Sequence, residues 1–255
     1  MQAQEQTTIT KEQNMNTEKP KWMKPAIAVA IVAVIILLGS VISGFINDQE
    51  QQSLLFDELD QLNEMSTAEK IDYEAVNEKL GTVVTTGDYV IVEKAMKRYM
   101  SDVVAVTKSM EEAMSTPAIV NALSPDNLSA GAPDFTETKA SLEAAHKALT
   151  EAKAEFQSLM TKERIMSYLE EDVDAKYVAL YEELSGGASE SEEPSGFNQV
   201  IDSIDQMITT IEVEQEALDF LAKNKGRWEI EDGQIFLKTE KLVDEYSAII
   251  APLFN

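Results

Sequence analysis

Apolar residues along this chain recur in steps of three and four, which is the spacing of one face of an α-helix. Two long series keep these steps throughout: Tyr89, Val92, Met96, Tyr99, Val103, Val106, Met110 and Ala113; and Phe135, Thr138, Leu142, Ala145, Leu149, Ala152, Phe156 and Leu159. A third long series falls on one helical stripe: Phe197, Val200, Ile201, Ile204, Ile208, Ile211, Leu218 and Leu221. Helices with such stripes must bury them against one another. The pattern predicts a mainly α-helical chain with an antiparallel bundle of about four helices.

Two further stretches have helical spacing, but the sequence leaves open how many helices each of them forms. Residues 48–80 predict either two helices or one helix broken near Ser66, because Ser66 and Glu69 have the capping-box spacing. Residues 134–184 begin with the second long series and predict either one helix or two helices that restart after Thr161. A final helix is expected from Glu240 until Pro252 ends it.

Two segments between these stretches lack helical spacing. Residues 117–133 contain three prolines among Ser, Asn, Asp and Gly, which predicts a loop. Residues 185–196 (SGGASESEEPSG) have almost no apolar side chain and predict an acidic linker. The linker separates the second long helical series from the third.

Residues 227–238 change to the alternating spacing of β-strands and predict a short hairpin around Asp232-Gly233. A two-residue turn there pairs Glu231 with Gln234. The same register places four apolar side chains on one face: Trp228, Ile230, Ile235 and Leu237. We expect this face to pack on the helices, since an isolated hairpin is marginally stable. Its alternative role is a partner-binding site, in which Trp228 would be the anchor.

Residues 25–46 (PAIAVAIVAVIILLGSVISGFI) carry no charge and are long enough to cross a bilayer as a helix. Three lysines precede this segment and several carboxylates follow it, which predicts an N-terminus in the cytoplasm. Residues 1–24 are polar and form the expected disordered tail. Residues 47–255 form the expected extracytoplasmic domain. The alternative interpretation is a cleaved signal peptide, for which Gly39, Ser40 and Ser43 supply small residues.

The charge balance excludes one class of partner for the predicted external domain. The chain has 46 acidic and 21 basic side chains, of which only three and four precede residue 47. An excess of carboxylates repels nucleic-acid backbones, so no nucleic-acid partner is expected. The chain has no cysteine, which excludes disulfides and thiolate chemistry.

The candidates for metal or catalytic chemistry are few. Glu143 and His146 have the spacing of a helical carboxylate metal site, but such a site needs a second histidine and the chain has one. Asp172 and Asp174 lack the glycine and distal glutamate of a calcium loop. No phosphate loop or nucleophile motif occurs in the sequence. We therefore expect no cofactor, no metal site and no enzymatic activity.

The expected function follows from location and architecture. The chain is predicted to be a single-pass membrane protein with a non-enzymatic extracytoplasmic interaction module or scaffold that binds an envelope protein. The alternative is a ligand-sensing ectodomain that acts with a separate signalling partner, because the polar N-terminal tail has no signalling domain. A ligand carrier would require cleavage of residues 25–46.

Overall fold

The computed structural model describes residues 49–66, 71–170, 172–185, 195–231 and 233–254. These residues are mainly helical and include one small antiparallel sheet of two strands. No helix among them combines the length and apolar character that crossing a membrane requires. The predicted tail (1–24), the predicted membrane segment (25–46) and all but the ends of the predicted acidic linker lie outside the described residues.

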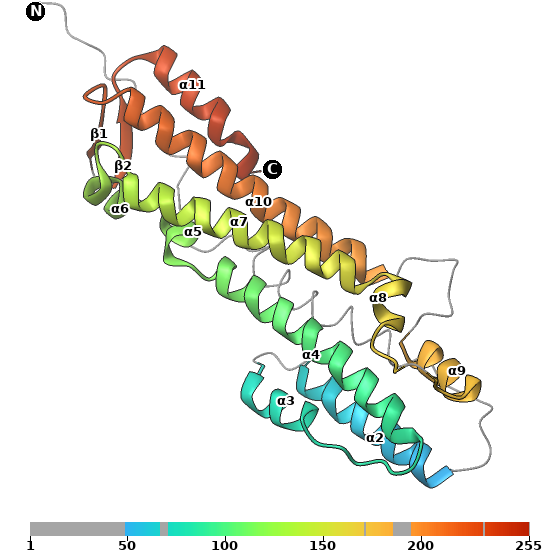
Figure 1. Cartoon of the computed structure of the whole chain (residues 1–255). Helices are drawn as coiled ribbons and strands as arrows, with labels where there is room; N and C mark the ends of the chain where they lie inside the picture. The colour runs from blue at the N-terminus through green and yellow to red at the C-terminus, as the bar shows by residue number, and fades with distance from the viewer. Residues whose placement is uncertain (1–48, 67–70, 171, 186–194, 232, 255) are drawn as a thin grey trace, which may run out of the picture. The chain divides into compact units, whose positions relative to one another are not determined.

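The elements in chain order are α2 (Gln49–Ser66), α3 (Tyr73–Leu80), α4 (Tyr89–Met114), α5 (Pro117–Asn121), α6 (Pro125–Gly131), α7 (Thr136–Leu159), α8 (Lys162–Met166), α9 (Ala175–Leu184), α10 (Ser195–Lys223), β1 (Trp228–Glu231), β2 (Gln234–Leu237), α11 (Glu240–Ile250) and the 3₁₀ helix η1 (Ala251–Phe254) (Figure 1).

The contacts divide the chain into two compact units. One comprises the described residues of Glu112–Thr150 and Asp205–Asn255, and we call it the hairpin unit. The other comprises the described residues up to Glu111 and of Glu151–Ile204, and we call it the network unit. Each unit is described separately below.

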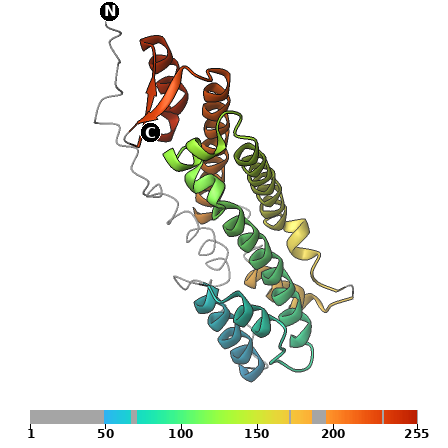
Figure 2. The same cartoon turned by 90° about the vertical axis from the view of Figure 1, so that its left-hand side faces the viewer.

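The network unit contains α2, α3 and most of α4, which lie side by side in both views (Figures 1 and 2). Helix α2 buries Leu55, Leu59 and Leu62 on one side, as helical spacing requires. Helix α3 begins where the side chain of Asp72 accepts a hydrogen bond from the backbone N–H of Ala75 at 3.1 Å. Residues 48–80 therefore form two helices, which settles the first open question.

The hairpin unit contains α7 up to Thr150 and α10 from Asp205 onward, which run antiparallel. Two pairs of opposite side chains fix this direction: Lys139 with Asp219, and His146 with Glu212. Helix α11 folds back on α10, and the ring of Tyr246 lies 5.8 Å from that of Phe220. The hairpin lies at the junction of α10 and α11 (Figure 2).

The hairpin has the predicted register, with Trp228 opposite Leu237, Ile230 opposite Ile235 and Glu231 opposite Gln234. The two-residue connection contains Gly233 at φ +73°, a conformation that glycine adopts without steric cost. The prediction of a hairpin over residues 227–238 is confirmed.

The predicted loop over residues 117–133 is wrong in part, because it contains the short helices α5 and α6. Pro117 and Pro125 both stand in the first turn of a helix, where the missing N–H has no intrahelical partner to lose. Ser124 caps α6 by accepting a hydrogen bond from the N–H of Asn127 at 3.3 Å. These prolines begin helices, whereas the sequence interpretation treated them only as breaks.

Residues 134–184 form three helices, whereas the sequence predicts one or two. Helix α7 ends at Leu159, α8 begins after the cap residue Thr161, and α9 begins after the cap residue Asp174. The predicted restart after Thr161 is therefore present. All eight residues of the second apolar series are buried, from Phe135 to Leu159.

Candidate functional site

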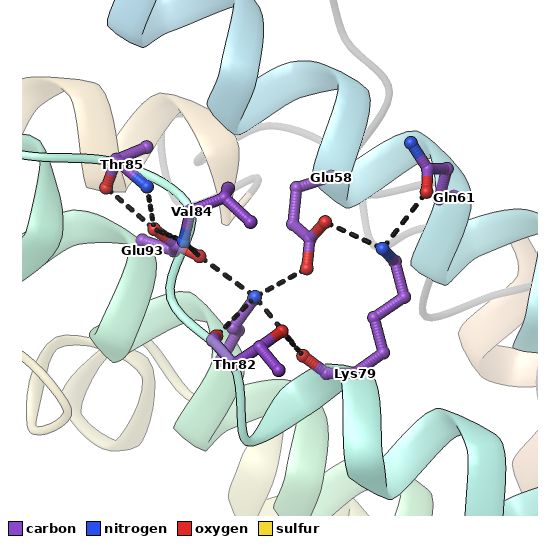
Figure 3. Close-up of polar contacts among 8 residues, drawn as sticks. Glu58, Gln61, Lys79, Thr82, Val84, Thr85 and Glu93 are labelled. Atoms are coloured by element: carbon purple, nitrogen blue, oxygen red, sulfur yellow. Dashed lines mark hydrogen bonds and ion pairs between the residues drawn. The ribbon is translucent and has the colours of Figure 1, made fainter.

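The most heavily charged buried site in the network unit surrounds Lys97 of α4, whose side chain is 3% exposed. Figure 3 shows residues of this site, among them Glu58, Lys79 and Glu93. The Nζ of Lys97 lies 2.6 Å from Oε1 of Glu58 and 2.9 Å from Oε1 of Glu93. It also donates to the backbone carbonyl of Thr82 at 2.7 Å and to that of Lys79 at 3.3 Å. The ammonium group thus joins α2, α4 and the segment that follows α3.

Glu93 is fully buried one helical turn before Lys97. Its carboxylate accepts hydrogen bonds from the backbone N–H groups of Val84 and Thr85, at 2.9 and 2.8 Å, and from the hydroxyl of Thr85 at 2.7 Å. Burial alone raises the pKa of this carboxyl, but the hydrogen bonds from Thr85 and Lys97 outweigh burial and hold the pKa below its usual value. Glu93 is therefore ionised at neutral pH.

Glu58 completes the network from α2. Its second carboxylate oxygen lies 2.7 Å from Nζ of Lys79, which also donates to Oε1 of Gln61 at 3.0 Å. Burial raises the pKa of Glu58, and the hydrogen bonds and positive charges of Lys79 and Lys97 lower it by more. Two carboxylates and two ammonium groups balance in charge, which buried ions require.

We define the network as Glu58, Lys79, Glu93 and Lys97, and its role in the fold is to hold residues 82–86 in place. This segment joins α3 to α4, and three of its backbone groups bond to Glu93 or Lys97. The backbone N–H of Thr86 donates in addition to Gln51 of α2. A segment without regular structure is therefore fixed between two helices.

The second buried carboxyl belongs to Glu214 of α10, in the hairpin unit. The residue is 7% exposed, and its buried Oε2 has no hydrogen-bond partner within the part of the chain that the structure describes. Burial raises its pKa to about 8. Glu214 is thus mainly protonated at pH 7, unlike Glu93.

The hairpin face predicted as a possible partner site lies toward the interior of the hairpin unit. Ile235 and Leu237 are buried, whereas Trp228 and Ile230 are half-buried. The Trp228 ring stacks on that of Phe135 with centroids 6.0 Å apart, and its Nε1 donates to the carbonyl of Leu221 at 2.7 Å. These contacts favour the packing role of this face over partner binding.

The residues considered for metal binding have ordinary structural partners. The Nε2 of His146 lies 3.3 Å from Oε1 of Glu212 at the rim between α7 and α10. Asp174 caps α9, since its side chain accepts a hydrogen bond from the N–H of Lys176 at 3.0 Å. Among the described residues, no group of three or more acidic or histidine side chains could hold a metal ion.

The sequence pattern did not single out the buried charged residues. Glu93 and Lys97 each follow a residue of the first apolar series, where a pair four residues apart is usually solvent-exposed on a helix. Their burial depends on α2 and residues 82–86, which come from elsewhere in the chain. Glu214 did carry a signal, because Val200, Ile204, Met207, Ile211, Glu214, Leu218 and Leu221 form an unbroken series of steps of four and three.

Comparison of this chain with known protein families, curated proteins and solved structures finds no match.

Proposed function

We propose that this chain is a single-pass membrane protein whose residues 47–255 form a non-enzymatic, extracytoplasmic interaction module or scaffold at the cell envelope. The observation that carries this proposal is the uncharged segment 25–46, with three lysines before it and an excess of carboxylates after it. Such a segment spans a bilayer, and the lysines remain on the cytoplasmic side.

We further propose that the long helices form the antiparallel bundle predicted from their apolar series.

The buried charges of the network support a structural role for these four residues over a catalytic one. Each carboxylate and each ammonium group of the network contacts at least one group of opposite charge, and the network stabilises a loop. A catalytic acid or base instead has a proton-transfer contact with a substrate. Many of the excess carboxylates of the module lie on its exposed helix faces, so a complementary partner surface is basic.

Topology is tested with single cysteines, since the chain has none of its own. Ser109 is exposed on α4, and Thr8 lies in the predicted tail. A membrane-impermeant maleimide on intact cells should label a Ser109→Cys variant, whereas a Thr8→Cys variant should react only after permeabilisation. The reverse pattern would contradict the orientation. A Ser109→Cys protein released into the medium, with a new N-terminus near Gly39, Ser40 or Ser43, would establish the cleaved signal peptide instead.

The interaction itself is tested by capture of the full chain from native membranes in mild detergent. We expect one envelope protein in near-stoichiometric amount, released by moderate salt because the contact is charged. Capture of the full chain alone, at several detergent and salt conditions, would contradict a scaffold role.

A further inference from the structure

Three large apolar side chains of the network unit are exposed where the fold does not cover them. Leu54 on α2 is 38% exposed, and Val83 and Val84, between α3 and α4, are 45% and 37% exposed. Single exposed apolar residues are common on protein surfaces. Three that lie together on a fixed edge are a candidate contact surface.

The hydrogen bonds place these three residues together. Thr82 and Glu58 both bond to Lys97, whereas the N–H of Thr86 bonds to Gln51. Residues 82–86 therefore run antiparallel to the α2 turns between Gln51 and Glu58. This direction puts Val83 and Val84 beside the turn that carries Leu54. We call Leu54, Val83 and Val84 the apolar edge.

The network fixes the backbone of residues 82–85, where the side chains of Val83 and Val84 are exposed. The backbone N–H groups of Val84 and Thr85 point to the buried carboxylate of Glu93. Thr85 is buried, while its neighbours on both sides are exposed. A buried ion network that is costly to desolvate therefore holds two valines at the surface of the molecule.

The apolar edge lies close in sequence to the predicted membrane segment. Leu54, the first residue of the edge, is eight residues beyond Ile46. Eight residues span roughly 12 Å as a helix and at most about 29 Å when extended. The headgroup layer on each side of a hydrocarbon core is roughly 5 to 8 Å thick. The edge reaches this layer when α2 lies along the bilayer surface, and lies beyond it when α2 continues straight out of the bilayer.

We propose that the apolar edge inserts among the headgroups of the bilayer that holds residues 25–46, and so sets the orientation of the network unit on the membrane. This inference rests on the proposed membrane anchor. Glu50, Asp57 and Asp88 are exposed near the edge. Their negative charges favour zwitterionic phospholipid over anionic lipid.

The test uses the full chain in phosphatidylcholine vesicles, with one cysteine at a time carrying an environment-sensitive fluorophore. Nitroxide-labelled phosphatidylcholine in the same vesicles quenches only fluorophores that contact lipid. Val83→Cys probes the edge, and Ser109→Cys is the matched exposed control in the same unit. Ala33→Cys probes the predicted membrane segment independently.

The inference expects strong quenching at residue 33 by nitroxides deep in the acyl chains, and quenching at residue 83 by nitroxides near the headgroups. Quenching at residue 83 should be several-fold greater than at residue 109. Adding Leu54→Ser and Val84→Ser to the Val83→Cys variant should reduce this quenching, and an unchanged circular dichroism spectrum would show that the fold is kept.

Three results would overturn the inference, and they separate it from the proposed function. Equal, weak quenching at residues 83 and 109 with strong quenching at residue 33 would leave the anchor and remove the edge contact. A blue-shifted but unquenched fluorophore at residue 83 would show a protein contact in place of lipid. Absence of quenching at residue 33 would contradict the anchor itself.

Discussion

The two units of this protein both bury glutamate, but in opposite electrostatic surroundings. In the network unit, Glu58 and Glu93 are paired with Lys97 and remain ionised. In the hairpin unit, Glu214 occupies a position of the apolar series on α10, its Oε2 has no hydrogen-bond partner among the described residues, and burial raises its pKa to about 8. Burial of an acidic residue therefore does not determine its charge, because the partners do.

The paired glutamates of the network unit and the buried Glu214 make the free energy of unfolding depend on pH in opposite directions. The lowered pKa values of Glu58 and Glu93 stabilise the folded state above the unfolded pKa of 4.5, and this contribution is lost as the pH falls through the folded values. The raised pKa of Glu214 means that the folded state keeps a proton that the unfolded chain releases above pH 4.5. Stability from this site therefore falls as the pH rises from 4.5 to about 8.

The largest effect is expected from removing the central cation of the network. Lys97→Met leaves two buried carboxylates without their shared ammonium group, so the free energy of unfolding should fall by about 3 to 5 kcal/mol. Reversible denaturant unfolding of the full chain in mild detergent, followed by circular dichroism, measures this loss. Lys94→Met is the matched control, because Lys94 is exposed on the same helix and its replacement should have little effect. Similar stability of the Lys97→Met and Lys94→Met variants would show that the central cation of the network does not stabilise the fold.

The Trp228→Ala variant tests whether the stability of the hairpin unit depends on apolar packing rather than on ion pairing. The ring stacks on Phe135 and its Nε1 bonds to Leu221, but the residue is half-buried. We expect a loss of about 2 to 4 kcal/mol, somewhat below that of a fully buried tryptophan. Unlike the Lys97→Met loss, this one should be the same at pH 4 and pH 7. An unchanged melting temperature would show that the hairpin face is free for a partner.

Glu214→Leu should increase stability, because leucine continues the apolar series and leaves no buried carboxyl. At pH 7 the expected gain is about 1 to 3 kcal/mol. The variant should also remove the decline in stability between pH 5 and pH 8, whereas Glu216→Leu, at an exposed position of the same helix, should not. A destabilised Glu214→Leu protein would indicate that the carboxyl has a function that its burial does not reveal.

The smallest effect is expected for an ion pair at the surface of the hairpin unit. Asp219 is 70% exposed and Lys139 is 28% exposed, so solvent screens their attraction. Lys139→Met should change the free energy of unfolding by less than about 1 kcal/mol. A loss comparable to that of Lys97→Met would show that exposure does not separate the two kinds of ion pair.

The helices and the hairpin could be predicted because their signals are local. The apolar series that ends in Phe156 and Leu159 and the turn at Gly233 both depend on neighbouring residues only. Helices α5 and α6 were missed because proline was interpreted as a break, although it also suits the first turn of a helix.

The network could not be predicted in the same way. Glu58 and Lys97 are 39 positions apart, and neither residue alone indicates that it is buried. Charged side chains at such positions are usually solvent-exposed. Glu214 differs, because its place in a regular apolar series predicts a buried position. That no cation pairs with it among the described residues can be seen only in the structure.

Hydrogen exchange of the full chain between pH 4 and pH 8, resolved by peptide mass spectrometry, tests the contrast between the two units most directly. After correction for the intrinsic pH dependence of exchange, protection of residues 207–218 should fall as the pH rises through this range. Protection of residues 82–97 should instead be lost only at the acid end. Parallel changes in the two regions would contradict the assignment of a paired, ionised network to one unit and an unpaired, protonated glutamate to the other.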